Sequence, residues 1–443
     1  MKKDGFSTGF MYVILVFLAV GLGLLIFFNF RANKKQQADI AEALEQAAAT
    51  STPAPTGTPV QTPEPHRTAE TIRLAFAGDL VGQAGLTTDA QRTADDGTVT
   101  YDFTEELDGV RGAVEDADMA ACTLVSTLTG AGGYDAYTMP ASAADALKDA
   151  GFDLVNAATD HTLDRGLDGL IETVNILQSS KLGVVGAYGS ANRSLLMANV
   201  RGVKVGFLSY TYSTATSTGD SQPVSIADNS WCLDLMTTDY MTTMETVDYE
   251  KIDADIAAIR QAGADIVVCF AYWWNNAQYY TEPRANQSAV ADHLLESGVD
   301  ILVGGGVKSP QPIEIRTVAR EDGNANCVVC YSLSNLMSCF TDNYTNISAV
   351  AQIEVSRDVD NGDVWISGVS AYPLFMDYAS GGEAGSRYRL LDAQEIVEYY
   401  DENDTPQETY DAVVNGISDL KTLMGEEYFR SGGMVLGYPY QAQ

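Results

Sequence analysis

The chain has 443 residues, of which 46% are hydrophobic and 19% charged, enough apolar material for a large core and too much for a disordered protein. Its formal net charge of −34 repels nucleic acid and anionic lipid headgroups, so we expect neither DNA nor RNA as a partner.

The first feature along the chain is an apolar N-terminal segment. Residues 5–30 carry no charge, and the 21 residues "FMYVILVFLAVGLGLLIFFNF" are long enough to cross a bilayer as one helix. The alternative is a cleaved signal peptide, which would have a shorter apolar region and a small-residue cleavage site, whereas basic "RANKKQQ" follows here. We therefore expect a transmembrane anchor in residues 1–35.

A Pro/Thr-rich stretch, "TSTPAPTGTPVQTPEP", follows the apolar segment. Such composition is typical of an extended, solvated spacer, so we expect a stalk over residues 36–70. Basic residues flank the anchor on both sides and leave its orientation open. The stalk favours a single-pass protein of the cell membrane with its main domain outside the cytoplasm.

Beyond the stalk, short apolar runs typical of buried strands alternate with helical patterns, which predicts an α/β domain over residues 71–378. The strands are expected at 71–79, 118–125, 152–159, 203–212, 264–272 and 299–306, and the helices at 141–150, 165–180, 250–263 and 286–298. After residue 320 strand patterns follow one another without helices, which predicts a second, more antiparallel sheet. Residues 379–443 are expected to form a C-terminal helical extension.

Two motifs resemble known binding sites, one for phosphate and one for zinc, but neither fits the pattern that such a site requires. "GGGVKSP" resembles a phosphate-binding loop, but Val307 separates Gly306 from Lys308 and a proline follows. Cys327 and Cys330 have zinc-like spacing, but on a strand they point to opposite faces. We expect the cysteines to be free and mostly buried.

Polar residues at two predicted strand ends are candidates for chemistry. Asp79 follows the first strand, and Asp160, His161 and Asp164 follow the third. Carboxylate and imidazole groups at strand ends are suited to binding metals or phosphate, although a strand-end Asp is also a common helix cap and a lone His is often structural.

The order of these motifs resembles the CapA family of bacterial poly-γ-glutamate capsule synthesis, which itself resembles calcineurin-type metallophosphatases. The matching pieces run from "FAGDL" through "DHTLDRGLDGL" and "VKVGFLSYT" to "GGGVKSPQP" and "YSLSN". The resemblance implies a two-sheet αββα sandwich of metallophosphatase-like type, a membrane anchor and a metal site at the sheet edge.

The same resemblance shows where ligands have been replaced. Family histidines stand at the positions held here by Gly305, Lys308 and Tyr272, and the family's N-L-E motif reads Thr-Leu-Val at 123–125. In place of N-N-H this chain has Thr-Asp-His at 159–161.

The remaining residues limit the expected metal chemistry. A dinuclear site needs more ligands than survive here, and Lys308 would place a cation where a metal should lie. We expect no resident cofactor, with a single weakly bound divalent metal on Asp79, Asp160 and His161 as the alternative. If catalysis remains, Asp79, His161 and Asp164 are its candidate residues.

The same edge offers candidate ligand-binding groups. Aromatic residues Tyr272, Trp273 and Trp274 follow a predicted strand and are suited either to stacking on a ligand or to filling the core. Lys308 with the backbone of Gly304, Gly305 and Gly306, in the segment that also holds Gln311, would suit a carboxylate or phosphate.

The sequence therefore predicts a membrane-anchored, extracytoplasmic, non-catalytic component of capsule or surface-polymer synthesis. Its expected partners are an anionic surface polymer such as poly-γ-glutamate, or the machinery that makes it. The rival hypotheses are a metal-dependent hydrolase or transferase with a rearranged site around Asp79, Asp160 and His161, and a purely structural surface protein.

Overall fold

The computed structural model describes residues 69–214, 223–273, 279–320, 323–378, 388–402 and 405–439. The expected anchor, and the expected stalk except for its last two residues, lie outside these ranges. Within them, no helix combines the length and apolarity needed to cross a membrane. The anchor, stalk and membrane location therefore stay predictions. Residues Arg67–Gln443 group as one compact unit.

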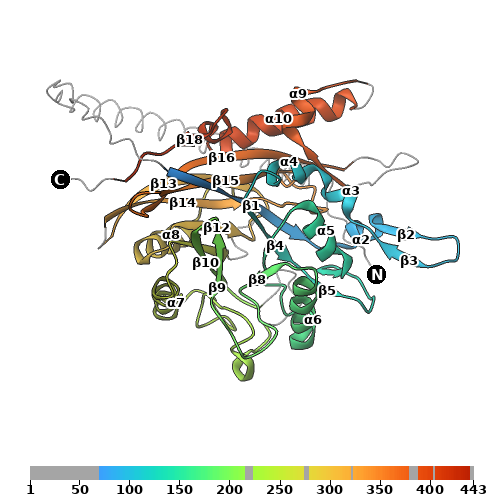
Figure 1. Ribbon diagram of the computed structural model, residues 1–443. Helices are drawn as coiled ribbons and strands as arrows, with labels where there is room; N and C mark the ends of the chain where they lie inside the picture. Colours follow the sequence, from blue (N-terminus) through green and yellow to red (C-terminus); the bar gives the residue numbers. More distant parts are fainter. Residues whose placement is uncertain are drawn as a thin grey trace, which may run out of the picture. The chain divides into compact units, whose positions relative to one another are not determined.

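Two mixed sheets form the centre of this unit (Figure 1). The first sheet has the order β17 (Arg389–Asp392), β16 (Val364–Asp377), β15 (Ile347–Asp358), β1 (Ala69–Val81), β4 (Met119–Val125), β7 (Leu154–Asn156) and β8 (Gly183–Val185), and β18 (Met434–Val435) pairs with β16. The second has the order β13 (Pro310–Arg320), β14 (Gly323–Leu333), β12 (Ile301–Gly305), β11 (Ile266–Tyr272), β10 (Val203–Thr211) and β9 (Leu196–Val200). The first sheet is antiparallel from β17 to β1 and parallel from β1 to β8, whereas the second has a parallel centre from β14 to β10 and one antiparallel strand at each edge.

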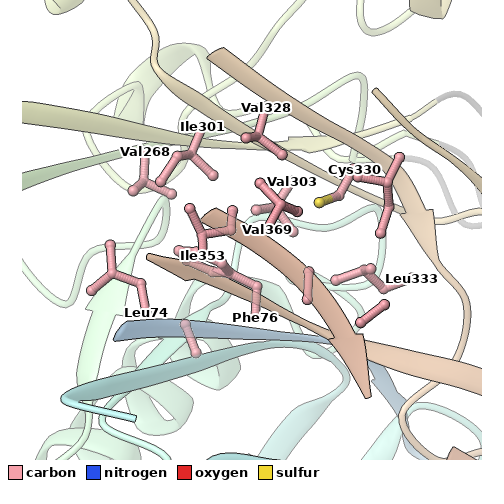
Figure 2. Packing of buried hydrophobic residues seen from close by; sticks show 14 of the residues in the cluster. Leu74, Phe76, Val268, Ile301, Val303, Val328, Cys330, Leu333, Ile353 and Val369 are labelled. Carbon is pink, nitrogen blue, oxygen red and sulfur yellow. The ribbon is translucent and has the colours of Figure 1, made fainter. Parts of the chain in front are cut away.

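The packing of the sheets explains why the sequences of their strands are continuous apolar runs. One face of each sheet contributes to a shared core, in which Leu74 and Phe76 of β1 lie opposite Val268, Ile301 and Val303 of the second sheet (Figure 2). The other faces are buried under helices, so strands such as β4 are buried on both sides. This is the pattern of strands in α/β proteins with both faces covered.

The helices cover the outer faces. Clusters of buried residues join the first sheet to α2 (Ala84–Asp89), α3 (Thr104–Leu107), α4 (Arg111–Val114) and α5 (Ser142–Ala150), and the second sheet to α7 (Tyr249–Gln261) and α8 (Ala285–Ser297). Helix α6 (Gly166–Ser179) packs in a separate cluster with the segment near residue 230. Two small pairs, β2 (Gln91–Thr93) with β3 (Val99–Tyr101) and β5 (Thr127–Thr129) with β6 (Thr138–Pro140), complete this part.

The strands after residue 320 do not form a sheet of their own, so that expectation was wrong. β14 lies parallel to β12 in the second sheet, whereas β15 pairs with β1 and β16 with β15 in the first. The connection between β14 and β15 therefore crosses from one sheet to the other, and each sheet contains strands from distant parts of the chain.

The expected C-terminal helices form as α9 (Ala393–Glu398) and α10 (Gln407–Met424), drawn in red along β16 in Figure 1. Buried Val413, Leu420 and Met424 of α10 join the core between the sheets. The short strands β17 and β18, on either side of the two helices, pair with β16. The C-terminal region is thus attached to the first sheet by strand pairing as well as by helix packing.

Cys327 and Cys330 lie on opposite faces of β14, as predicted for the "CVVC" segment. Cys327 lies in the cluster under α7 and α8, while Cys330 lies in the core between the sheets. Both thiols are free, like the other four, and burial raises the pKa of each to about 12.

Candidate functional site

The candidate polar residues come together where both sheets end. Asp79 lies near the end of β1, Asp160 and His161 lie in the turn after β7, Tyr272 ends β11, and Gly306 follows β12; all line one small cavity. The carboxyl ends of parallel strands are the usual place for functional groups in α/β folds. β1 continues to Val81, past a register shift after Phe76, so Asp79 lies inside the strand and not after it as expected.

The position of Asp79 is fixed by contacts with the second sheet. Its N–H donates to the carbonyl of Ser334 at 3.0 Å, and its Oδ2 accepts from the N–H of Gly306 at 2.7 Å. The neighbouring Gly78 allows this approach, because a Cβ there would lie 2.0 Å from the Ser334 carbonyl oxygen. Gly306 adopts a φ of +83°, which glycine tolerates and other residues rarely adopt.

The environment of Asp79 favours its protonated form. The side chain is 3% exposed, and burial raises its pKa to about 7; the Gly306 hydrogen bond acts in the opposite direction, and the negative charge of Asp160 adds a smaller upward contribution. At neutral pH a larger fraction of Asp79 is therefore protonated than of an ordinary carboxylate.

Asp160 and His161 form a second buried pair. Oδ2 of Asp160 accepts from the Tyr212 hydroxyl at 3.1 Å, and Oδ1 lies 3.7 Å from Nε2 of His161. Burial raises the pKa of Asp160, opposed by His161 and by hydrogen bonds from Tyr212 and Tyr272. Oδ1 is buried and has no hydrogen-bond partner among the described residues.

The imidazole of His161 is held on its other side. Nδ1 lies 2.7 Å from Oδ2 of Asp164, and the ring stacks on Tyr137 with centroids 3.3 Å apart and planes 12° apart. Asp164 therefore orients His161, and only Nε2 is directed toward Asp160. The expected grouping of Asp79, Asp160, His161 and Asp164 at one edge agrees with this geometry, while their chemical roles stay predictions.

Lys308 supplies a positive charge at the same cavity. Its ammonium nitrogen lies 4.0 Å from the Phe340 ring centroid and 5.2 Å from that of Tyr279, and donates to the Tyr279 hydroxyl at 3.4 Å. Burial lowers the pKa of Lys308, against the carboxylates of Asp160 and Asp342, which raise it. The side chain is half-buried, so a negatively charged group from outside has access to it.

The cavity itself is small. It measures about 10 Å³, room for about one water molecule. Asn335 also lines it, and its Oδ1, like Oδ1 of Asp160, is buried without a hydrogen-bond partner among the described residues. Three nearby residues, Tyr137, Tyr279 and Ser334, have φ values of 62–65°. Such backbone conformations are costly for residues other than glycine and cluster at functional sites.

A metal centre with the family's full ligand set does not fit these residues. No group of three or more His, Cys, Asp or Glu side chains in the described ranges is arranged to hold a metal ion. Gly305, where the resemblance places a histidine, faces the site, since a Cβ there would lie 2.8 Å from Oδ1 of Asp79. Its replacement by glycine therefore removes a side chain from the cavity itself.

Three of the expected ligand-binding residues serve the core instead. Trp273 is fully buried, and its indole N–H donates to the Tyr331 carbonyl at 2.7 Å. Gly304 packs against this indole, because a Cβ there would lie 2.1 Å from Nε1. Gln311, also fully buried, donates to the carbonyls of Tyr280 and Glu282 and so anchors the loop before α8. Trp274 lies outside the described residues.

Three residues of the site were missed by sequence reasoning. Tyr212 directly follows β10 and could have been found by the same strand-end argument. Asn335 lies in the "YSLSN" motif, which carried the resemblance but was given no role. Tyr137 has no sequence signal, because it comes from a loop that only the fold places over His161.

These features define a class: a two-sheet α/β protein with a buried carboxylate and histidine cluster where the strands of both sheets end. The chain belongs to the bacterial capsule synthesis protein family PGA_cap, whose family model matches residues 73–339.

Individual relatives agree with this assignment. The capsule biosynthesis protein CapA of Bacillus anthracis is 26% identical over 221 residues, which are 49% of this chain and 47% of that protein. The PGA biosynthesis protein CapA of Bacillus subtilis (strain 168) is 25% identical over 219 residues, 48% of this chain and 49% of that protein. The match thus spans about half the length of each curated relative.

A crystal structure described as a novel phosphatase from Mycoplasma pneumoniae aligns with a TM-score of 0.39 and 12% identity, over 69% of this chain and 94% of that one.

Proposed function

We propose that this chain is a membrane-anchored, extracytoplasmic component of capsule synthesis or export that binds an anionic polymer, such as poly-γ-glutamate, without cleaving it. Its family and its CapA relatives support the capsule role. The anchor and stalk rest on the N-terminal sequence, and the binding role rests on the site.

The observation that carries the proposal is the position of Lys308. Among the described residues its ammonium group makes one long hydrogen bond, to Tyr279, and otherwise faces two aromatic rings. An ammonium group has three donors, so capacity remains for an incoming carboxylate. On a chain with a net charge of −34, a local cation is what an anionic polymer requires.

The state of the surrounding groups supports binding over hydrolysis. Asp79 accepts from Gly306, Asp160 from Tyr212, and His161 is oriented by Asp164, so each of these side chains already makes one hydrogen bond within the protein, although Oδ1 of Asp160 makes none among the described residues. A partly protonated Asp79 also repels an acidic polymer less than an ionised carboxylate would.

The test is binding of fluorescently labelled poly-γ-glutamate to the full-length protein, followed by anisotropy. Lys308→Met keeps most of the apolar side chain and removes the charge, and we expect it to weaken binding about tenfold or more. Lys308→Arg should retain binding. Lys204→Met, at an exposed lysine of β10, is the matched control and should bind like the unchanged protein.

Equal binding by Lys308→Met and the unchanged protein would refute the role of Lys308. Hydrolysis of phosphate esters or of poly-γ-glutamate by the purified protein with added metal would refute the non-catalytic role.

A second candidate function is a metal-dependent hydrolase or transferase with a rearranged site. The observation that favours it is the pair of buried oxygens without hydrogen-bond partners, Oδ1 of Asp160 and Oδ1 of Asn335, which line the same cavity. Oxygen donors of this kind suit a hard divalent cation.

Elemental analysis after incubation with manganese, magnesium and calcium separates the two candidates. The hydrolase candidate predicts near-stoichiometric metal that is lost in Asp160→Asn and retained in Asp145→Asn, a surface control. The binding proposal predicts no stoichiometric metal in either protein.

A further inference from the structure

A larger cavity of about 470 Å³ lies outside the residues that the family model matches. It is bounded by the connection 341–346 between β14 and β15, by the end of β16, and by one side of α10 from Ala412 to Asp419. We call it the Tyr344 groove. Its volume is in the range of small-molecule binding sites.

Three aromatic residues are among those that line the groove. Tyr344 is 36% exposed, with a φ of 65°, and Phe375 and Tyr378 lie beside it in the lining. Two hydrogen bonds stabilise the turn that carries Tyr344: the N–H and the hydroxyl of Thr345 both donate to the carbonyl of Asp342. The partly exposed ring is thus carried by a hydrogen-bonded turn with a strained backbone, and such strain clusters at functional sites.

Amides and carboxylates supply most of the polar lining of the groove. Asn343, Asn346 and Asn415 line it, and within the described ranges their side chains make no hydrogen bonds. Asp342 and Asp419 add two acceptors, and no lysine or arginine of the described residues lines the groove. The groove therefore offers both donors and acceptors, with a negative charge that disfavours an acidic ligand.

This combination matches one class of ligand. Aromatic rings pack against the C–H faces of sugars, and amide and carboxylate side chains hydrogen-bond with hydroxyl groups. We propose that the Tyr344 groove binds a neutral glycan chain, with a sugar ring on Tyr344 and its hydroxyls on Asn415 and Asp419. The proposal does not depend on the polymer site at Lys308.

The groove is nevertheless connected to that site. Burial and the negative charge of Asp342, which lines the groove, raise the pKa of Tyr279, and the Tyr279 hydroxyl accepts from Lys308. A glycan in the groove and an acidic chain at Lys308 would therefore lie next to each other on the same protein. The placement suits a component that holds a charged polymer against a neutral glycan surface.

The experiment measures binding of cellohexaose, chitohexaose and maltohexaose to the full-length protein by calorimetry, in a detergent without a sugar headgroup. We expect at least one of the three to bind. Tyr344→Asn removes the ring but tolerates the left-handed backbone, and should weaken binding about tenfold. Asn415→Ala, on an exposed helix position, should weaken it several-fold without destabilising α10.

Matched controls are Tyr399→Asn and Ser418→Ala, exposed residues outside the groove that should bind like the unchanged protein. Spermidine and poly-γ-glutamate serve as charged probes. The proposal is overturned if no hexasaccharide binds, if Tyr344→Asn binds as tightly as the controls, or if Tyr344→Asn weakens only spermidine or poly-γ-glutamate binding.

Discussion

Replacing Asp79 by Asn should change how the stability of the protein depends on pH. The pKa of this carboxyl is about 7 in the folded protein and 3.8 in an unfolded chain. Because the folded state holds the proton more tightly, the group stabilises the folded protein below pH 3.8, and this stabilisation is lost as the pH rises through 7. The difference between the two pKa values, at roughly 1.36 kcal/mol per pH unit, corresponds to about 4 kcal/mol.

The measurement is urea unfolding of the unchanged protein and of Asp79→Asn at intervals from pH 4 to 8, with EDTA present. The Asn side chain keeps an acceptor for the Gly306 N–H and cannot ionise, so contributions from groups that do not interact with Asp79 cancel in the difference between the two proteins, whereas that of Asp160, whose charge acts on Asp79, is included in it. We expect the variant to gain about 4 kcal/mol of unfolding free energy relative to the unchanged protein across this range. A difference that stays constant with pH would show that Asp79 is ionised throughout and that burial does not control its charge.

Two further substitutions test the packing around the site. Gly306→Ala should destabilise the protein by about 1–3 kcal/mol, because φ is +83° and a Cβ would lie 3.1 Å from the Tyr272 ring. Urea unfolding measures this loss, and an unchanged unfolding midpoint would contradict the prediction. Trp273→Phe should cost about 2 kcal/mol through the lost hydrogen bond to Tyr331, whereas Trp231→Phe, at a partly exposed position, should cost less; equal losses would argue against a buried role for Trp273.

The strands and the polar residues at their ends were predictable because they depend on local patterns. Apolar runs end near Asp79 and Asp160, and the parallel arrangement then brings these ends together. The membership of the sheets was not predictable in this way. β15 pairs with β1 through partners such as Leu74 and Ile353, and nothing in either run distinguishes that pairing from one with β14.

In the candidate site, too, some contacts were predictable from local sequence and others depend on tertiary packing. His161 and Asp164 are close in sequence, and their contact could be expected from spacing alone. The stacking of Tyr137 on His161 and the burial of Trp273 depend on how loops and sheets pack, which a single sequence does not reveal. That position 305 faces the site was predicted only through the family resemblance. In the structure, a Cβ at this position would lie close to Asp79, which agrees with the prediction.

The hydrogen bond from Gly306 to Asp79 joins the two sheets across 227 positions of the chain. A contact so distant in sequence cannot form until the second sheet has assembled, and non-local contacts of this kind form slowly. In the unfolded chain the carboxyl of Asp79 is exposed and has its ordinary pKa of 3.8, whereas burial in the folded protein raises that pKa to about 7. Proton uptake, followed with an indicator dye during refolding at pH 6, would therefore time the docking of the two sheets.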